Sequence, residues 1–115
     1  MNSGDVPPLF EVPDWMGRPV RCQRETWDLV VEKHPDMRPR LREVIRAVRA
    51  PFLVAQDRDI AVHVSFYGMS DRSDLWLKVV VRYLNTPGGA SGEVVTAFRT
   101  RRVRQGDAVL YRRGT

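Results

Sequence analysis

The sequence predicts an α+β fold: two N-terminal helices packed on one face of a four- to five-stranded antiparallel sheet. Three observations predict it. Apolar residues recur at helical spacing over residues 24–49, and the pattern switches to alternation of apolar and polar residues after Pro51. The third observation is the order of these segments. Helices followed by successive strands are typical of α+β folds with the helices on one side of the sheet.

The first 22 residues carry little regular pattern. Prolines and glycines recur at irregular intervals over residues 1–18, so we expect an irregular N-terminal arm there, followed by a single domain over residues 19–113. Apolar side chains of the arm, such as Trp15, are expected to pack onto that domain. Residues 19–22 are expected to add a short edge strand.

The first helix is predicted over residues 24–34. The spacing of one helical face is shared by Trp27, Val30, Val31 and His34. Pro35 disfavours helical backbone at the residue before it, so the helix should end near His34. A histidine there has two interpretations. It caps the last carbonyl groups, favoured by the helix dipole, or it points a titratable imidazole into a cleft.

The second helix is predicted over residues 37–49. Asp36 is placed to cap its N-terminus, with Pro39 in the first turn. The apolar stripe consists of Met37, Leu41, Val44, Ile45 and Val48. Another face carries Arg38, Arg42, Arg46 and Arg49. Glu43 and Asp36 partly offset these arginines, which makes this face a weak candidate for phosphate contacts.

Four strands are predicted after the helices, with a short fifth at the C-terminus. They are residues 52–56, 60–67, 75–84, 93–100 and 108–113. In the second of them, His63, Ser65 and Tyr67 share one face. The Gly-rich residues 85–92 are expected to form the connector between the third and fourth strands.

Hydrophilic side chains interrupt the two strongest strand patterns. Lys78 and Arg82 lie in one, and Thr96 and Arg99 lie in the other. Lysine is depleted in strand centres and is almost never fully buried without a partner. Lys78 therefore either reaches water past the rim of the sheet or works in a cleft. The alternation alone leaves both open, because a polar sheet face is often only solvated.

The charge of the chain favours an anionic partner. The formal net charge is +5 and the pI is about 10.1. Nearly all of the basic residues are arginines, which pair bidentately with phosphate oxygens. Arginine-rich codon usage is the alternative explanation. A basic run over residues 99–104 is either a phosphate anchor or a solvated loop.

Several classes of protein are disfavoured. No apolar run approaches a membrane span, and no secretory signal pattern opens the chain. Cys22 is the single cysteine, so an internal disulfide is excluded and a reducing cytoplasm is the default location. No His/Cys cluster has zinc spacing, no P-loop is present, and the scattered carboxylates argue against a two-metal nuclease. We expect no metal and no cofactor.

Short motifs spread over residues 18–111 point to one family. In order, they are Trp27 to Val30, Lys33-His34-Pro35-Asp36, Pro51, Phe66-Tyr67, Leu77-Lys78-Val79-Val80-Val81 and Val94-Val95-Thr96-Ala97-Phe98. This ordered set resembles the phage-type branch of the barnase–EndoU–colicin–RelE-like nuclease superfamily. The resemblance implies a nuclease domain over residues 19–113.

The resemblance also implies an activity, metal-independent RNA cleavage by a toxin or effector. The ribose 2′-hydroxyl attacks the adjacent phosphorus and leaves a 2′,3′-cyclic phosphate and a 5′-hydroxyl. It implies His34 as general base or acid, Lys78 as stabiliser of the phosphorane, Tyr67 as second proton donor or base-stacking group, and Thr96 as donor to the phosphate. The expected substrate-binding residues are His63, Arg82, Arg99, Arg101 and Arg102.

Two other functions stay open. Phe98 stands where the family more often has tyrosine, and Phe66 precedes Tyr67 where two tyrosines are usual. The loss of hydroxyl groups favours a non-catalytic RNA- or protein-binding module on the same scaffold. A ribosome-dependent toxin of the same fold class is a further alternative. RNA, such as tRNA, is the expected partner, and a toxin would also require an acidic immunity or antitoxin protein.

Overall fold

The computed structural model describes residues 6–72 and 74–114, and within them the chain forms a mixed α+β fold. The strands are β1 (Phe10–Pro13), β2 (Pro19–Cys22), β3 (Leu53–Gln56), β4 (His63–Met69), β5 (Trp76–Thr86), β6 (Gly89–Thr100) and β7 (Ala108–Arg112). The helices are α1 (Arg24–Lys33), the short 3₁₀-helix η2 (Pro35–Met37) and α2 (Leu41–Arg49). No helix in the described ranges is long and apolar enough to cross a membrane.

The described strands form one seven-stranded sheet in the order β1-β2-β6-β5-β4-β3-β7. The prediction of four or five antiparallel strands is wrong in number and in character. Neighbouring strands are antiparallel except β2 and β6, which pair in parallel over two residues of each strand. The α+β class and the placement of helices before the main strands are confirmed.

The predicted irregular arm contains a strand. Over Phe10–Pro13 the chain pairs with β2, with Phe10 opposite Cys22 and Pro13 opposite Pro19. The two prolines lie at the ends of their strands, where a missing N–H disrupts the ladder least. Four residues are too few for the alternation to be recognised in the sequence. The pairing with β2 provides hydrogen-bond partners for backbone N–H and C=O groups of the arm. Residues 1–5 of the predicted arm lie outside the described residues.

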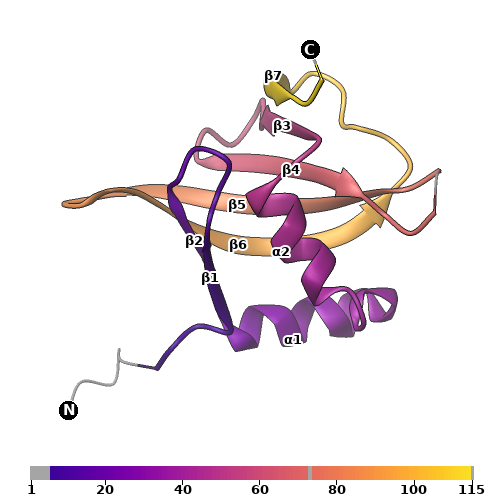
Figure 1. The fold of residues 1–115 in the computed structure, drawn as a ribbon, viewed down its shortest axis with the longest axis horizontal. Helices are drawn as coiled ribbons and strands as arrows, with labels where there is room; N and C mark the ends of the chain where they lie inside the picture. Colours follow the sequence, from indigo (N-terminus) through magenta and orange to yellow (C-terminus); the bar gives the residue numbers. More distant parts are fainter. Residues whose placement is uncertain (1–5, 73, 115) are drawn as a thin grey trace.

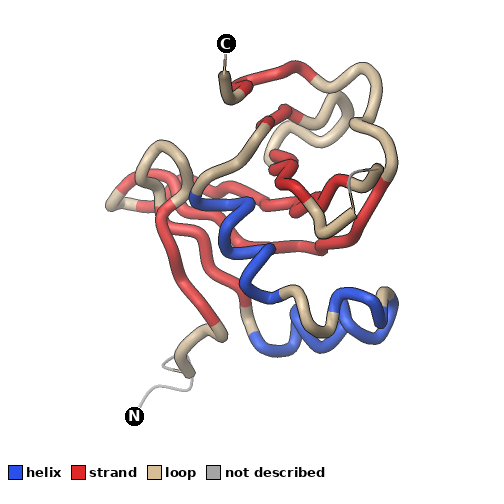
Figure 2. Tube along the Cα trace, turned by 45° about the vertical axis from the view of Figure 1, so that its right-hand side comes forward, coloured by secondary structure: helices blue, strands red, loops and turns tan. Residues whose placement is uncertain are grey.

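Helix α2 packs on one face of the sheet, and helix α1 lies along strand β6. In Figure 1, α2 lies in front of the long strands β4 and β5, and α1 runs below them beside β6. Gly68 of β4 sits so close to α2 that a Cβ there would lie 2.9 Å from the Cβ of Ala47. The tube view, in which the helices are blue, shows the same layering (Figure 2).

The second helix begins later than predicted. Residues 35–37 form η2, and α2 starts at Leu41 with Arg40 at its N-cap. Asp36 does not cap α2, because it lies in η2, five residues before the helix begins. Its carboxylate is bound by Arg99 of β6 at 2.8 Å. The predicted apolar stripe is confirmed: Met37, Val44 and Val48 are fully buried, and Leu41 and Ile45 pack against the core.

Two strand boundaries also differ from the prediction. β4 begins at His63 because the Asp57 carboxylate accepts hydrogen bonds from the backbone N–H groups of Asp59 and Ile60, which turns the chain before the strand. The Gly-rich connector is mostly strand. Thr86 pairs with Gly89, whose φ of +116° suits glycine, so only two residues form the loop of the long β5–β6 hairpin.

Candidate functional site

Lys78 lies at the centre of the sheet face that α2 does not cover. The strand register places it between Tyr67 of β4 and Phe98 of β6. Its Nζ atom is 5.5 Å from the centroid of the Tyr67 ring and 5.6 Å from that of the Phe98 ring. Both distances are within the range of cation–π attraction. The two aromatic rings thus hold the ammonium group on this face.

The charge of Lys78 is not neutralised by a carboxylate. The side chain is half-buried, and it forms no ion pair with any acidic residue of the described part of the chain. Its partial exposure lets the ammonium group keep contact with water without an acidic partner. The uncompensated charge therefore favours an anion at this point of the surface. Lys78 lies between two aromatic rings rather than at the rim of the sheet.

His34 ends α1 as predicted. It is the C-cap residue, and its backbone N–H donates to the carbonyl of Val30 at 2.8 Å. Its imidazole lies against the Phe98 ring, with centroids 5.5 Å apart and planes tilted by 32°. The side chain is half-buried. Phe98 thus contacts both His34 and Lys78, and these two residues lie on either side of it.

A groove between α1 and β6 includes this contact. It has a volume of about 430 Å³, and its lining includes Lys33, His34, Thr96 and Phe98. The groove exists because β2 pairs with β6 only at Gly92 and Glu93, so the remainder of the β6 edge faces α1. Two of the predicted catalytic residues, His34 and Thr96, therefore line one groove, and Lys78 lies outside this lining, next to the Phe98 ring.

Phe98 is the residue of this group whose importance the sequence did not reveal. From the sequence it was only the position of an absent hydroxyl group. In the structure its ring joins the groove to Lys78. The alternation of β6 places it on the same face as Thr96, but its contact with His34 depends on how α1 packs. Lys33 was likewise not expected in the groove.

Tyr67 is not accessible for the role that the resemblance implies. Its side chain is 0% exposed, and its hydroxyl oxygen accepts a hydrogen bond from the backbone N–H of Arg104 at 3.2 Å. The C-terminal segment covers it: Val103 packs on a small second core around Tyr67. The residue anchors this segment to the sheet and positions the ring beneath Lys78.

Arg99, predicted to bind substrate, is already occupied by two carboxylates. It donates to Asp36 at 2.8 Å and to Asp71 at 3.0 Å, and its side chain is only 16% exposed. The hydrogen bond from Arg99 lowers the pKa of Asp36. Asp36 lies two residues after His34, so this contact holds the turn that carries the imidazole. Arg99 thus ties the turn after α1 to β6 through its ion pairs.

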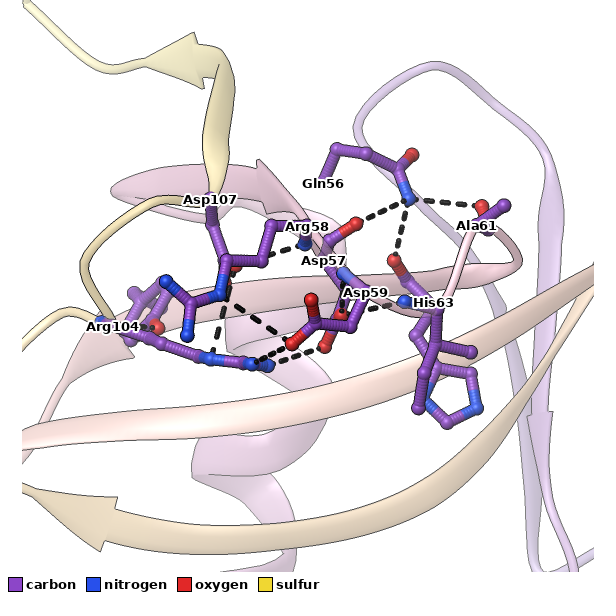
Figure 3. Close-up of polar contacts among 10 residues, drawn as sticks. Gln56, Asp57, Arg58, Asp59, Ala61, His63, Arg104 and Asp107 are labelled. Carbon is purple, nitrogen blue, oxygen red and sulfur yellow. Dashed lines mark hydrogen bonds and ion pairs between the residues drawn. The ribbon is translucent and has the colours of Figure 1, made fainter.

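His63 and Arg82 lie away from the groove. They face each other across β4 and β5, four residues along β5 from Lys78, which is about 13 Å at the rise of a strand. Gln56 donates to the carbonyl of His63 at 3.0 Å. Figure 3 shows the His63 imidazole pointing away from the neighbouring group of charged residues.

In the predicted basic run over residues 99–104, two of the four arginines form ion pairs. Arg104 donates to Asp57 and Asp59, each at 2.7 Å (Figure 3), and Arg99 is bound as described above. Arg101 and Arg102 are exposed and form no ion pair within the described ranges. Arg99 and Arg104 thus connect separate segments of the chain through ion pairs, whereas Arg101 and Arg102 form an exposed cationic surface.

Metal-binding groups and relatives give no further guide to the site. In the described residues, no three His, Cys, Asp or Glu side chains are grouped so that they could hold a metal ion. Compared with protein-family models, curated proteins and solved structures, the chain shows no significant match. The resemblance to the nuclease superfamily therefore rests on the sequence motifs alone, and the function has to be argued from the geometry of the groove.

Proposed function

We propose that the protein is a metal-independent endoribonuclease, acting as a toxin or effector in the cytoplasm. The observation that carries the proposal is the unpaired Lys78 ammonium group separated from His34 by a single aromatic ring. A cation without a carboxylate, a titratable imidazole and the hydroxyl-bearing Thr96 are the groups that cleavage at a phosphodiester requires. The excess of arginine over lysine and the net charge of +5 also support an RNA substrate.

The proposed reaction is an internal transfer at phosphorus. Neutral His34 accepts the proton of the ribose 2′-hydroxyl as its oxygen bonds to phosphorus. The bond from phosphorus to the 5′ oxygen then breaks, and that oxygen takes a proton. Lys78 neutralises the extra negative charge of the phosphorane, and Thr96 donates a hydrogen bond to a phosphate oxygen. The products are a 2′,3′-cyclic phosphate and a 5′-hydroxyl.

Tyr67 has no place in this proton transfer, because it is fully buried. Lys78 is the proposed donor to the leaving 5′ oxygen, because its ammonium group carries protons and lies next to the Phe98 ring that borders the groove. Phe98 takes the stacking role in place of a tyrosine. Single-stranded RNA is commonly held by bases stacked on aromatic side chains, and the half-buried Phe98 ring borders the groove.

Incubation with tRNA and total RNA in EDTA tests the proposal. We expect cleavage products that end in a 2′,3′-cyclic phosphate, and we expect His34→Ala to reduce the rate by at least 100-fold. His63→Ala is the matched control, because it removes the only other histidine of the chain and lies away from the groove. Intact RNA at micromolar protein, or equal cleavage by wild type and His34→Ala, would overturn the proposal.

A second candidate is an RNA-binding module without catalysis. It is favoured by one observation: Tyr67 is buried and Phe98 carries no hydroxyl group, so Thr96 is the hydroxyl that remains in the groove. This candidate predicts binding that weakens steeply with salt, survives Lys78→Ala and His34→Ala, and yields no products. Cleavage of free RNA would exclude it, and it would exclude a ribosome-dependent toxin as well.

A further inference from the structure

The solvent-facing side of α2 carries an arginine surface that the groove does not use. We define it by Arg42, Arg46 and Arg49, which recur at i, i+4 and i+7 and therefore share one helix face. All three are exposed, and together with Ile45 and Ala50 they line a shallow depression of about 550 Å³. We propose that this arginine surface binds the phosphate backbone of RNA at a site separate from the groove.

The charge of this surface is unopposed. None of the three arginines forms an ion pair within the described residues. The nearby Glu43, which the sequence suggested would offset them, is engaged by Arg40 at 3.0 Å. By contrast, Arg99 forms ion pairs with two carboxylates and Arg104 with three. Arginines that are left without carboxylates in a chain rich in such pairs are available to bind an external anion.

The composition of the surface favours a phosphate chain over an acidic protein. Protein–protein interfaces have an apolar core, commonly with aromatic residues, but none of the exposed large hydrophobic residues lies on α2. Interfaces with nucleic acids are more polar and more positively charged. Three guanidinium groups spaced over about 10 Å of helix match a repeated anion better than a single carboxylate.

The position of the surface determines which RNAs it affects. α2 packs against one face of β4 and β5, whereas Lys78 lies on the other face. An RNA that touches both sites has to pass around the sheet, so a dinucleotide in the groove does not reach α2. The choice of RNA over DNA rests on the proposed function. We therefore expect the arginine surface to increase the affinity for long RNA and to leave the cleavage of a dinucleotide unchanged.

The test compares two triple variants of equal charge. One replaces the surface (Arg42→Ala, Arg46→Ala and Arg49→Ala), and the matched control replaces three paired arginines (Arg21→Ala, Arg58→Ala and Arg72→Ala). Binding of a labelled 30-nucleotide RNA of mixed sequence is measured over a salt series with His34→Ala in both. We expect the surface variant to bind at least tenfold more weakly and its salt slope to fall by about 2. Thermal unfolding verifies that both variants fold.

Each outcome decides the proposal. Equal loss in both triple variants would show that only net charge matters, and would overturn it. Normal RNA binding by the surface variant, or a surface that binds a poly-glutamate peptide and not RNA, would overturn it too. Salt-dependent binding lost in the surface variant, together with a wild type that cleaves nothing, would support the surface and reject the nuclease. Undiminished RNA affinity of the surface variant, together with RNA cleavage by the wild type, would do the reverse.

Discussion

The two faces of β5 differ in what they contact. Toward α2, the strand presents Leu77, Val79 and Val81, each 0% exposed and part of the main core. Toward the opposite face it presents Trp76, Lys78 and other half-buried or exposed side chains. Adjacent residues of a strand point to opposite sides. The same eleven residues therefore fill the core with one set of side chains and leave a half-buried charged group on the other side of the sheet.

The open face is itself divided by what covers it. At the β3 side, the C-terminal segment lies over Tyr67, held by Val103 and by the ion pairs of Arg104. At the β6 side, α1 leaves a groove that is lined by His34 and Thr96. Lys78 lies between these regions. The open face is thus covered at the β3 side and hollowed at the β6 side.

The largest expected effect concerns the charge on the open face. Replacing Lys78 by methionine keeps most of the aliphatic stem and removes the ammonium group. We expect RNA cleavage to fall by about 10²- to 10³-fold, with little change in stability. Arg82→Met is the matched control, since Arg82 lies on the same strand and face but away from the groove. Equal activity of Lys78→Met and wild type would remove Lys78 from the mechanism.

The next effect concerns the covered face. Val79→Ala removes two methyl groups from a fully buried position, so we expect the free energy of unfolding to fall by about 2–3 kcal/mol. Val80→Ala, one residue along and on the open face, is expected to cost less because Val80 is only half-buried. Urea unfolding measures both. Equal losses would mean that the two faces do not differ in packing.

The covered face also contains a pH-sensitive group. Burial raises the pKa of the Cys22 thiol to about 12, whereas the unfolded thiol titrates near 8.5. The folded state therefore holds the proton more tightly, and this stabilisation is lost as pH rises above about 8.5. We expect about 1–2 kcal/mol less stability at pH 10 than at pH 7.5, and a shallower fall in Cys22→Ala. Parallel pH profiles of the two proteins would contradict this.

The smallest effect concerns the covered part of the open face. Tyr67→Phe removes the hydroxyl oxygen that accepts the backbone N–H of Arg104, which should cost about 1 kcal/mol of stability. The rate of RNA cleavage should be unchanged, because the hydroxyl does not reach solvent. A 100-fold fall in rate, measured at a temperature where the variant is folded, would return Tyr67 to the catalytic role that the resemblance implies.

Sequence reasoning predicted the long elements better than the short ones. The helix ending at His34, the apolar stripe of α2 and the strand pair around Lys78 each have enough residues for their period to be visible. β1 has four residues, and its partner β2 pairs with β6 in parallel, a contact across about 70 residues of chain. Such pairing leaves no local pattern. Asp36 shows the limit of local rules: its position suggested a helix cap, but its carboxylate binds Arg99, which lies 63 residues away in the chain.

By itself, the sequence determined which side chains share a strand face and where the first helix ends, because the periods of strands and helices are local properties of the backbone. It also determined that Lys78 interrupts an apolar strand. Only the tertiary structure decided that Phe98 lies between Lys78 and His34, that Tyr67 is covered, and that Arg99 is bound by carboxylates. These outcomes depend on packing between segments far apart in the chain, and the spacing of residues along the chain does not predict such packing.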